Sequence, residues 1–243
     1  VANSSGWNSA SHRSGRAILS EFEIVGLTPG RHGAELRLPS GTRVVMFNVH
    51  LNHAPYQPYQ LLRIPYADAP FLSSADELVA AAHAARGHEL DAVIDEMEAY
   101  LQQGIPVVLT GDFNEPSHQD WTVRAVEAGH APLVVSYPTT RKAVAIGMRD
   151  AYRAIYPDEV AYRGLTWTPT TSIHDPNDRH DRIDFVFVSS AIRVELVHVI
   201  GEHDTYADIV VDPYPSDHRA VAATLSVSID KRTTSNNAVP NPN

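Results

Sequence analysis

The sequence contains no cysteine. This absence excludes a disulfide framework, a zinc ribbon, a thiol nucleophile and an iron–sulfur cluster. No apolar run approaches the roughly 18–20 residues that a helix needs to cross a bilayer. Lysine is scarce, since only Lys142 and Lys231 occur among the 19 basic residues, and 29 acidic residues bring the net charge to −10.

The acidic balance bears on the partners that the protein can have. Non-specific binding of duplex nucleic acid draws its affinity from basic side chains on phosphates. Nucleic acid is therefore a possible substrate that the charge does not favour. An acidic protein can still act on a phosphate ester when a metal cation lies between its carboxylates and the phosphate.

The length and composition of the chain indicate one globular domain. The chain has 243 residues, of which 43% are hydrophobic, enough for a core without covalent cross-links. We predict a single domain over residues 1–230 and a polar, disordered tail over residues 231–243. The sequence begins at Val1 without a methionine or a signal-peptide pattern. A trimmed N-terminus and the Asn/Pro-rich tail suggest a secreted protein.

Hydrophobic patterning predicts a β-rich α/β domain. The capping box that begins at Ser74 predicts a long helix that ends near Gly104. Shorter helices are predicted over 121–128 and 148–156, and residues 1–14 and 52–72 are predicted to lack regular structure. The predicted strands are 16–20, 22–26, 34–38, 43–51, 106–110, 165–168, 183–188, 192–200 and 218–227.

Polar residues recur at the ends of, or inside, four apolar strands. The four segments are Phe47–Leu51, Leu109–Asn114, Asp181–Val186 and Pro215–Arg219. Each has a structural explanation when taken alone: a histidine satisfied within the fold, a Gly-Asp-x-Asn turn, an Asp184–Arg182 ion pair, or a cap. Their occurrence together and in this order favours a functional site, because a buried carboxylate or imidazole is costly without a partner or a metal.

Together these segments resemble the endonuclease/exonuclease/phosphatase superfamily of deoxyribonuclease-I-like enzymes. The resemblance rests on His50-Leu51, Gly111–Asn114, Ile183-Asp184 and Ser216–His218, and on the strand-like Gly15–Ser20 before them. It covers about residues 15–228. It implies an α/β (α+β) fold, a four-layer α/β/β/α sandwich of two mixed β-sheets flanked by helices.

The chain departs from the family pattern at its start. Family members carry an early strand with an Asn and a second strand with a metal-binding Glu, and only 14 residues precede Gly15 here. We therefore expect the N-terminal strand–helix–strand portion to be absent from this chain. That portion was removed or lies on a separate fragment, which would then be a partner, or the chain is a defective relative.

The resemblance implies a metal-dependent hydrolysis of a phosphodiester or phosphomonoester by in-line attack of an activated water. One or two Mg²⁺ ions, or Mn²⁺ or Ca²⁺, would assist. Asp184 would hold His218 in one tautomer, and Asp112 would orient or deprotonate the water. The implied catalytic residues are His50, Asp112, Asn114, Asp184 and His218, and the implied metal ligands are Asp217, Asp112, Asn114 and His218.

The residues that follow His50 are expected to border the site. The candidates for substrate binding are Asn48, His53, Tyr56 and Tyr59. Their side chains could stack on a base, hold a head group or touch lipid, and a packed Ω-loop is an equally good interpretation. Trp121 and Trp167 are predicted to belong to the core.

Several alternatives stay open at this point. The enzyme could be a deoxyribonuclease-like endonuclease or a phospholipid/sphingomyelin-type phosphodiesterase. Gly201–Asp204 resembles part of a calcineurin-type phosphatase motif but lacks its bridging Asn. The chain could also be a catalytically inactive phosphate-binding module.

Overall fold

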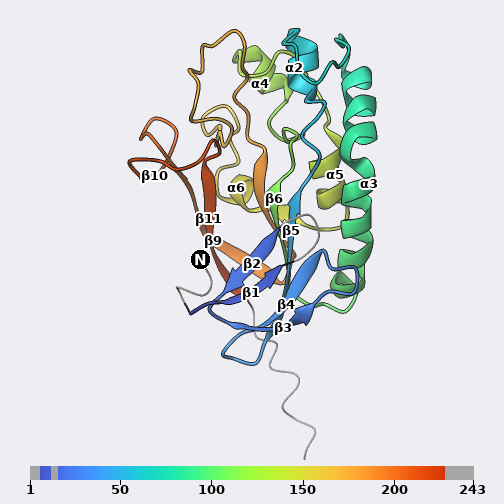
Figure 1. The fold of residues 1–243 in the computed structure, drawn as a ribbon, viewed down its shortest axis with the longest axis vertical. Coiled ribbons are helices and arrows are strands. Elements are labelled where there is room, and N and C mark those ends of the chain that lie inside the picture. The colour runs from blue at the N-terminus through green and yellow to red at the C-terminus, as the bar shows by residue number, and fades with distance from the viewer. Residues whose placement is uncertain (1–5, 12–15, 228–243) are drawn as a thin grey trace, which may run out of the picture.

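The computed structural model describes residues 6–11 and 16–227, and the predicted tail lies outside these residues. Figure 1 shows the arrangement of the elements. The strands are β1 (Asn8–Ser11), β2 (Ala17–Ser20), β3 (Glu23–Leu27), β4 (Gly33–Arg37), β5 (Arg43–His50), β6 (Val107–Asp112), β7 (Arg149–Asp150), β8 (Asp184–Val188), β9 (Ile192–Gly201), β10 (Ile209–Val210) and β11 (Ala220–Val227). The helices are α2 (Gln57–Leu62), α3 (Ala75–Leu101), α4 (Val123–Glu127), α5 (Pro138–Ala145) and α6 (Ala151–Ile155).

A six-stranded mixed sheet forms the centre, in the order β3-β4-β5-β6-β8-β7. β5 and β6 are parallel, whereas the other neighbours are antiparallel. Both faces of β5 are covered, which explains its nearly continuous apolar sequence. Val45 and Phe47 pack toward one core cluster, and Val44 packs toward the other.

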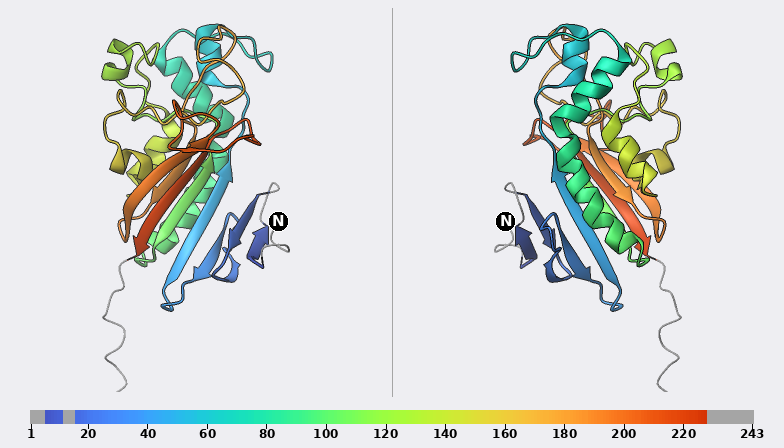
Figure 2. Two further views of the ribbon diagram at one scale, coloured as in Figure 1. Left: turned by 90° about the vertical axis from the view of Figure 1, so that its left-hand side faces the viewer. Right: turned by 90° about the vertical axis from the view of Figure 1, so that its right-hand side faces the viewer.

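The long helix α3 covers one face of this sheet (Figure 2). Ser74 caps it by accepting from the Glu77 N–H while Glu77 binds back to the Ser74 backbone, so the predicted capping box is confirmed. Leu90, Val93 and Met97 give the helix its buried stripe. The helix continues through Gly87 without a break.

The other face carries the three-stranded sheet β10-β9-β11, which packs on the central sheet through Val197 and Val199. The β1-β2 hairpin packs on β4 through Ala10, Ile18 and Ala34. The expected α/β fold of mixed sheets flanked by helices is therefore confirmed (Figure 2).

Three predictions of local structure were wrong, and one helix was not predicted. Residues 8–11 form strand β1, because they pair with β2 through backbone hydrogen bonds. The polar sequence of these residues does not indicate a strand. Residues 57–62 form α2 inside the segment predicted to be irregular, and residues 138–145 form the unpredicted α5. Residues 165–168 form no strand: Trp167 makes only isolated bridges to Asp181 and His218.

A buried arginine fixes the segment that follows β5. Arg86 of α3 has a fully buried side chain and donates to the backbone oxygens of Asn52 (3.1 Å) and Pro55 (2.8 Å). It also donates to Gln57 Oε1 (2.5 Å) and lies 3.3 Å from Glu115 Oε2. These bonds tie residues 52–57 to the helix layer, directly beside the end of β5.

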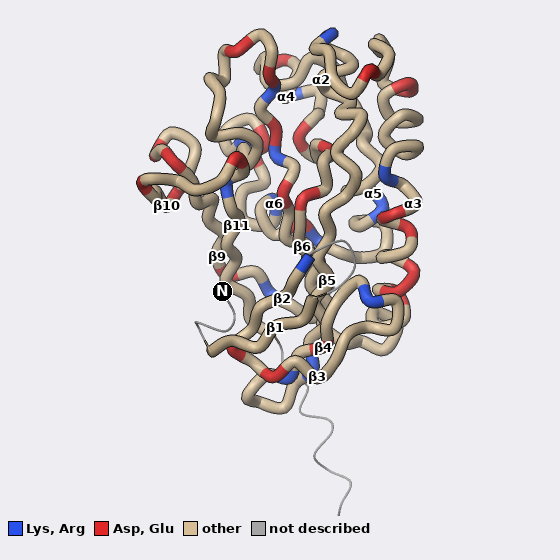
Figure 3. Tube along the Cα trace, viewed as in Figure 1, with Lys and Arg blue, Asp and Glu red and all other residues tan. Residues whose placement is uncertain are grey.

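Acidic and basic residues are interspersed over the described chain, and α3 in particular carries several acids along its length (Figure 3). No basic stripe of the kind that grips duplex phosphates stands out in this view. Among the described residues, no helix combines the length and the apolar character that crossing a membrane requires.

Candidate active site

Three of the predicted site residues form one row across three neighbouring strands. His50 of β5 pairs in register with Asp112 of β6, and Asp112 pairs in register with Asp184 of β8. Residues in register on adjacent strands of a sheet lie about 5 Å apart. Three segments that are distant in the sequence thus place the His50 imidazole and the Asp112 and Asp184 carboxylates at one end of the sheet.

Gly111 permits the close approach of β5 and β6 at this row. Its φ of 136° lies in a region that favours glycine, and an added Cβ would stand 1.9 Å from the Val49 carbonyl oxygen. After Asp112 the chain turns: Asn114 has φ 48°, and its N–H donates to Asp112 Oδ1 at 2.7 Å. The Gly-Asp-x-Asn segment is therefore both a turn and part of the site.

His218 completes the cluster from the loop before β11. Its Nδ1 lies 2.9 Å from Asp184 Oδ2, which leaves Nε2 facing Asp112 Oδ2 at 3.9 Å. His50 Nε2 approaches the same Asp112 oxygen at 3.5 Å. The predicted Asp184–His218 pair is therefore present, and Arg182 binds Asp120 and Asp150 instead of Asp184.

The surroundings change the proton affinities of two of these groups. Burial, and then the charge of Asp184, raise the pKa of Asp112 to about 6, although the Asn114 N–H and both imidazoles oppose the shift. Burial opposes the charged form of His218, yet its hydrogen bond to Asp184 and the nearby acids raise its pKa above the ordinary value. A carboxyl group that titrates near neutrality suits a general base.

The cluster fits a hard divalent cation. Asp112, Asp184 and His218 each offer a ligand atom, and these atoms lie within 4.8 Å of one another. Burial and then the charge of Asp184 disfavour the ionised form of Asp112 and raise its pKa, and a cation bound between the two carboxylates would offset both effects. Carboxylate oxygens are the ligands that Mg²⁺ prefers. Asp217, which is exposed, lines the same cavity and could contribute a further oxygen.

The row opens into a cavity of about 430 Å³ whose walls are of two kinds. One part is polar and the other consists largely of rings. The lining residues are His50, His53, Tyr56, Tyr59, Tyr66, Asp112, Asn114, Trp167, Ile183, Asp217 and His218. Most of the predicted site residues thus meet here.

Two predicted site residues differ from their expected placement or environment. Asn48 does not line the cavity: its Oδ1 accepts from Thr110 Oγ1 and its Nδ2 donates to the Ala17 carbonyl oxygen. Asp184 lies behind His218, where its predicted role of holding the imidazole places it. The Asn114 amide donates to Leu51 O and Asp112 Oδ2, so it positions the carboxylate.

Sequence reasoning missed two rings of the site. Trp167 is half-buried and packs against the His218 ring with 4.8 Å between ring centres, so its predicted place in the core was wrong. Tyr66 also lines the cavity. Its position in the same Pro- and Tyr-rich segment as Tyr56 and Tyr59 was the available signal. Trp121 is buried, as predicted.

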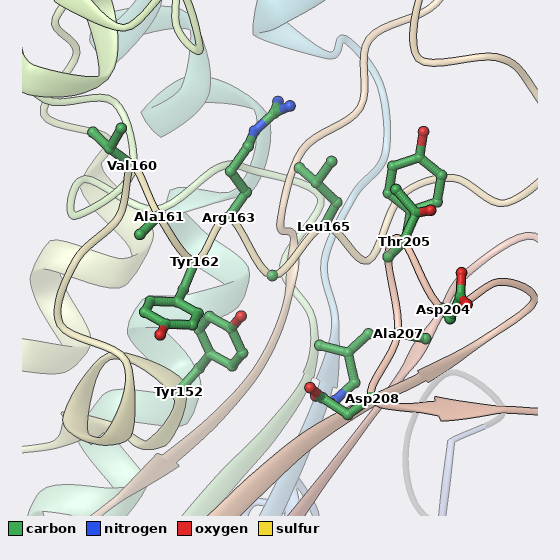
Figure 4. Close-up of a pocket in the computed structure, with 13 residues that line it drawn as sticks. Tyr152, Val160, Ala161, Tyr162, Arg163, Leu165, Asp204, Thr205, Ala207 and Asp208 are labelled. Atoms are coloured by element: carbon green, nitrogen blue, oxygen red, sulfur yellow. The ribbon is translucent and has the colours of Figure 1, made fainter.

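A second cavity of about 270 Å³ lies apart from this centre, between α6, the loop before residue 165 and the loop that follows β9 (Figure 4). Tyr152, Tyr162, Arg163 and Asp208 are among its lining residues. None of the predicted site residues lines it. The clustered acids and imidazoles therefore identify the 430 Å³ cavity at the strand ends as the candidate active site.

The fold and this cluster at the strand ends define an α/β sandwich of the phosphoesterase type. Residues 3–218 match the model of the endonuclease/exonuclease/phosphatase family, and the chain belongs to this family. Members of the family are hydrolases that act on phosphoester bonds. The predicted family membership is thus confirmed.

Individual relatives share little sequence identity with this chain. An uncharacterised protein of Caenorhabditis elegans is 27% identical over 209 residues, which are 81% of this chain and 64% of the relative. The chain therefore spans about two thirds of that relative's length. The 3′ phosphatase NExo from Neisseria, bound to a product DNA hairpin, has a TM-score of 0.52, with 19% identity over 92% of this chain and 81% of that one. An AP endonuclease from Archaeoglobus fulgidus has a TM-score of 0.50, with 16% identity and coverages of 93% and 81%.

The Asp184–His218 hydrogen bond leads to a prediction about the pKa of His218. In Asp184→Asn, the carboxylate charge and the strong acceptor are lost while the side-chain size is kept, so the pKa of His218 should fall below its value in the parent protein. NMR titration of the His218 ring in metal-free protein measures this change. An unchanged His218 midpoint would show that Asp184 does not stabilise the imidazolium.

Proposed function

We propose that the chain is a divalent-metal-dependent phosphoesterase that hydrolyses its substrate by in-line attack of water. The observation that carries the proposal is the pair of imidazoles, His50 and His218, on either side of Asp112 Oδ2. Hydrolysis at phosphorus needs a base for the water and donors for the phosphoryl oxygens, and this cluster offers both kinds of group.

Each residue has a part that its contacts support. Asp112, whose pKa is about 6, accepts the proton of the attacking water near neutral pH. His218 is held through Nδ1 by Asp184 and donates from Nε2 to a phosphoryl oxygen. His50 has a side chain that is 62% exposed, so it can reach the phosphate or the leaving group. Asn114 keeps the Asp112 carboxylate in place.

A divalent cation would be held by Asp112 together with Asp217, which leaves Asp184 and His218 paired with each other. When bound, it would supply positive charge to the phosphate oxygens that gain electron density. The kinship with a DNA 3′ phosphatase and an AP endonuclease supports DNA phosphoesters as one candidate substrate class, next to small phosphodiesters.

The test is metal-dependent hydrolysis of bis-p-nitrophenyl phosphate, a diester, and p-nitrophenyl phosphate, a monoester. We expect turnover with Mg²⁺ or Mn²⁺, loss of turnover in EDTA and recovery when metal is restored. His218→Ala should lower kcat by about 10²–10⁴-fold, the usual contribution of a positioned acid or base. Turnover that survives EDTA and this substitution would overturn the proposal. Phosphate binding without turnover under any metal would instead favour an inactive phosphate-binding module.

A further inference from the structure

Arg163, in the loop between α6 and β8, is a half-buried arginine without a counter-charge. Among residues 6–11 and 16–227, its side chain has no hydrogen bond and no ion pair. Burial lowers the pKa of this guanidinium, and the charge of the neighbouring Arg179 lowers it further. Withdrawing a charge from water without giving it a partner is costly, and it is unexpected in a chain whose acids outnumber its bases by 29 to 19.

The acids nearest to Arg163 are already bound to other arginines. A narrow space beside Arg163 is lined by the acids Asp120, Glu159 and Asp181. The ion pairs of these three acids are Asp120 with Arg153 (2.7 Å) and Arg182 (2.9 Å), Glu159 with Arg124 (3.0 Å), and Asp181 with Arg179 (3.3 Å). One positive charge is therefore left over at Arg163, and no carboxylate of the described chain forms an ion pair with it.

Arg163 lines a cavity of about 250 Å³ together with Arg179 and His180. It also lines the 270 Å³ cavity, whose described lining contains two acids, Asp204 and Asp208, and no other basic residue. Figure 4 shows the Arg163 guanidinium pointing away from Asp208. The cavity of about 250 Å³ is therefore the one in which this guanidinium meets further cationic or proton-accepting groups.

His180 contributes an orphaned polar atom to the same cavity. This residue is 3% exposed, and its Nδ1 is buried without a hydrogen-bond partner among the described residues. Thr171 Oγ1 donates to Asp178 Oδ2 at 2.6 Å and lies 3.0 Å from His180 Nε2, so Nε2 carries the proton of the neutral ring. A bound anion would favour protonation of Nδ1, which would then donate to that anion.

Two acids also line this cavity, and both of their carboxylates already accept hydrogen bonds. Asp178 accepts from the Tyr59 hydroxyl and from Trp167 Nε1, and Asp175 accepts from the Asn177 N–H at 2.8 Å. Tyr59 and Trp167 line the active-site cavity. Asp178 therefore lies in a layer that separates the two cavities, and the free charge of Arg163 lies outside the catalytic centre.

We propose that the cavity lined by Arg163, Arg179 and His180 is a second binding site, which takes the phosphoryl group of an organic phosphate. A guanidinium can hold two phosphate oxygens at once, and a second guanidinium nearby suits the double charge of a phosphate monoester. The carbon part of the ligand would lie against the apolar lining residues, which are Leu62, Ile64, Ile173 and Pro176. The inference goes beyond the proposed function, because none of these residues belongs to the acid–imidazole cluster.

Calorimetric titration of phenyl phosphate into the protein in EDTA measures this site. Arg163→Met should weaken binding by about tenfold or more, the loss expected when a charged hydrogen bond is removed. Arg163→Lys keeps the charge without the planar fork and should lose less. Arg141→Met, at an exposed arginine of α5, is the matched control and should bind as the parent does.

The same titrations with a single-stranded oligothymidylate distinguish two sources of the phosphoryl group. A loss of phenyl phosphate affinity in Arg163→Met would identify a free monoester as the ligand. A loss confined to the oligothymidylate would identify a phosphate within a nucleotide chain. Undiminished affinity for both probes in both Arg163 variants would overturn the inference.

His218→Ala separates this site from the catalytic centre, which could also bind phosphate. We expect the Arg163-dependent binding to remain in His218→Ala, whether or not the parent protein hydrolyses any ester. Loss of that binding in His218→Ala would place the ligand at the catalytic centre and would refute a second site. A failure of the proposed function and a failure of this inference are thereby distinguishable.

Thermal unfolding provides an independent measurement. Because Arg163 lies beside Arg179 without a counter-charge, Arg163→Met should melt at the parent's temperature or higher in phosphate-free buffer. Phenyl phosphate should raise the melting temperature of the parent and leave that of Arg163→Met nearly unchanged. A variant that melts well below the parent, and that phenyl phosphate still stabilises as it does the parent, would show that Arg163 is a structural residue and would contradict the proposal.

Discussion

Replacing Asp112 by Asn is expected to abolish most hydrolysis and, at the same time, to stabilise the metal-free protein. An amide cannot accept the proton of the attacking water, so kcat should fall by about 10²–10⁴-fold. Stability should move in the opposite direction because the parent carboxylate is held in unfavourable surroundings, buried and beside Asp184. Active-site residues that are poised for chemistry often destabilise the fold in this way.

The pH dependence of this stabilisation follows from the direction of the pKa shift. Folding raises the pKa of Asp112 from 3.8 to about 6, so the folded protein holds this proton more tightly than the unfolded chain does. The contribution to stability is therefore greatest below pH 4 and is lost as the pH rises through about 6. Two pKa units correspond to roughly 3 kcal/mol. We expect Asp112→Asn to gain about 1–3 kcal/mol at pH 8, because the amide also disturbs the contact with Asn114.

Thermal unfolding in EDTA at pH 8 and at pH 4 measures the change, at about 2–4 °C per kcal/mol for a chain of this size. The gain should be present at pH 8 and small at pH 4. Asp204→Asn is the matched control, since Asp204 has a side chain that is 84% exposed and should change neither stability nor turnover appreciably. A variant that is less stable than the parent at pH 8 would show that Asp112 is better accommodated than its burial indicates.

Replacing Arg86 by Met is expected to cost about 3–5 kcal/mol of unfolding free energy, the usual effect of removing one partner of a buried ion pair. Met keeps an unbranched apolar stem but leaves Glu115 without its cation and the Asn52 and Pro55 oxygens without their donor. Since the Arg86 and Glu115 side chains are both fully buried, water cannot replace these bonds without opening the structure.

Urea unfolding monitored by circular dichroism gives this free energy. Arg193→Met is the matched control: Arg193 pairs with Glu195 at 2.7 Å, but its side chain is 76% exposed, so its loss should cost less than about 1 kcal/mol. Equal effects of the two substitutions would refute the structural role assigned to Arg86. Arg86→Lys should recover only part of the stability, because an ammonium cannot span the separate acceptors as a guanidinium does.

Much of the sheet and of the polar cluster could be predicted from the sequence. Apolar β-branched runs indicated β5, β6 and β8, and the capping box at Ser74 indicated α3. The predicted catalytic residues all lie at or directly behind one cavity. His50 and Asp112 end parallel strands and Asp184 begins an antiparallel one at the same edge of the sheet, whereas His218 reaches this edge from the loop before β11. The roles of these residues, the number and kind of ions, secretion and the incomplete N-terminus stay predictions.

The parts that escaped prediction depend on tertiary contacts. β1 is polar and forms because β2 supplies its partner. α2 lies in a Pro-rich segment without periodicity, and Arg86 and the packing around it determine its place. The site position of Trp167 arises from bridges to Asp181 and His218, residues that lie 14 and 51 positions further along the chain. No local pattern reveals such contacts.

The row of His50, Asp112 and Asp184 across three strands has a consequence for how this protein can change. Those groups are placed by strand register, so a single-residue insertion within β5, β6 or β8 would turn one of them to the opposite face of the sheet. The rings of Tyr56, Tyr59 and Tyr66 come from the connection between β5 and α3, which can vary in length and composition without disturbing that register. Separate features of the fold thus place the acid–imidazole cluster and the aromatic part of the cavity wall, so the lining of the cavity can change while the cluster stays in register.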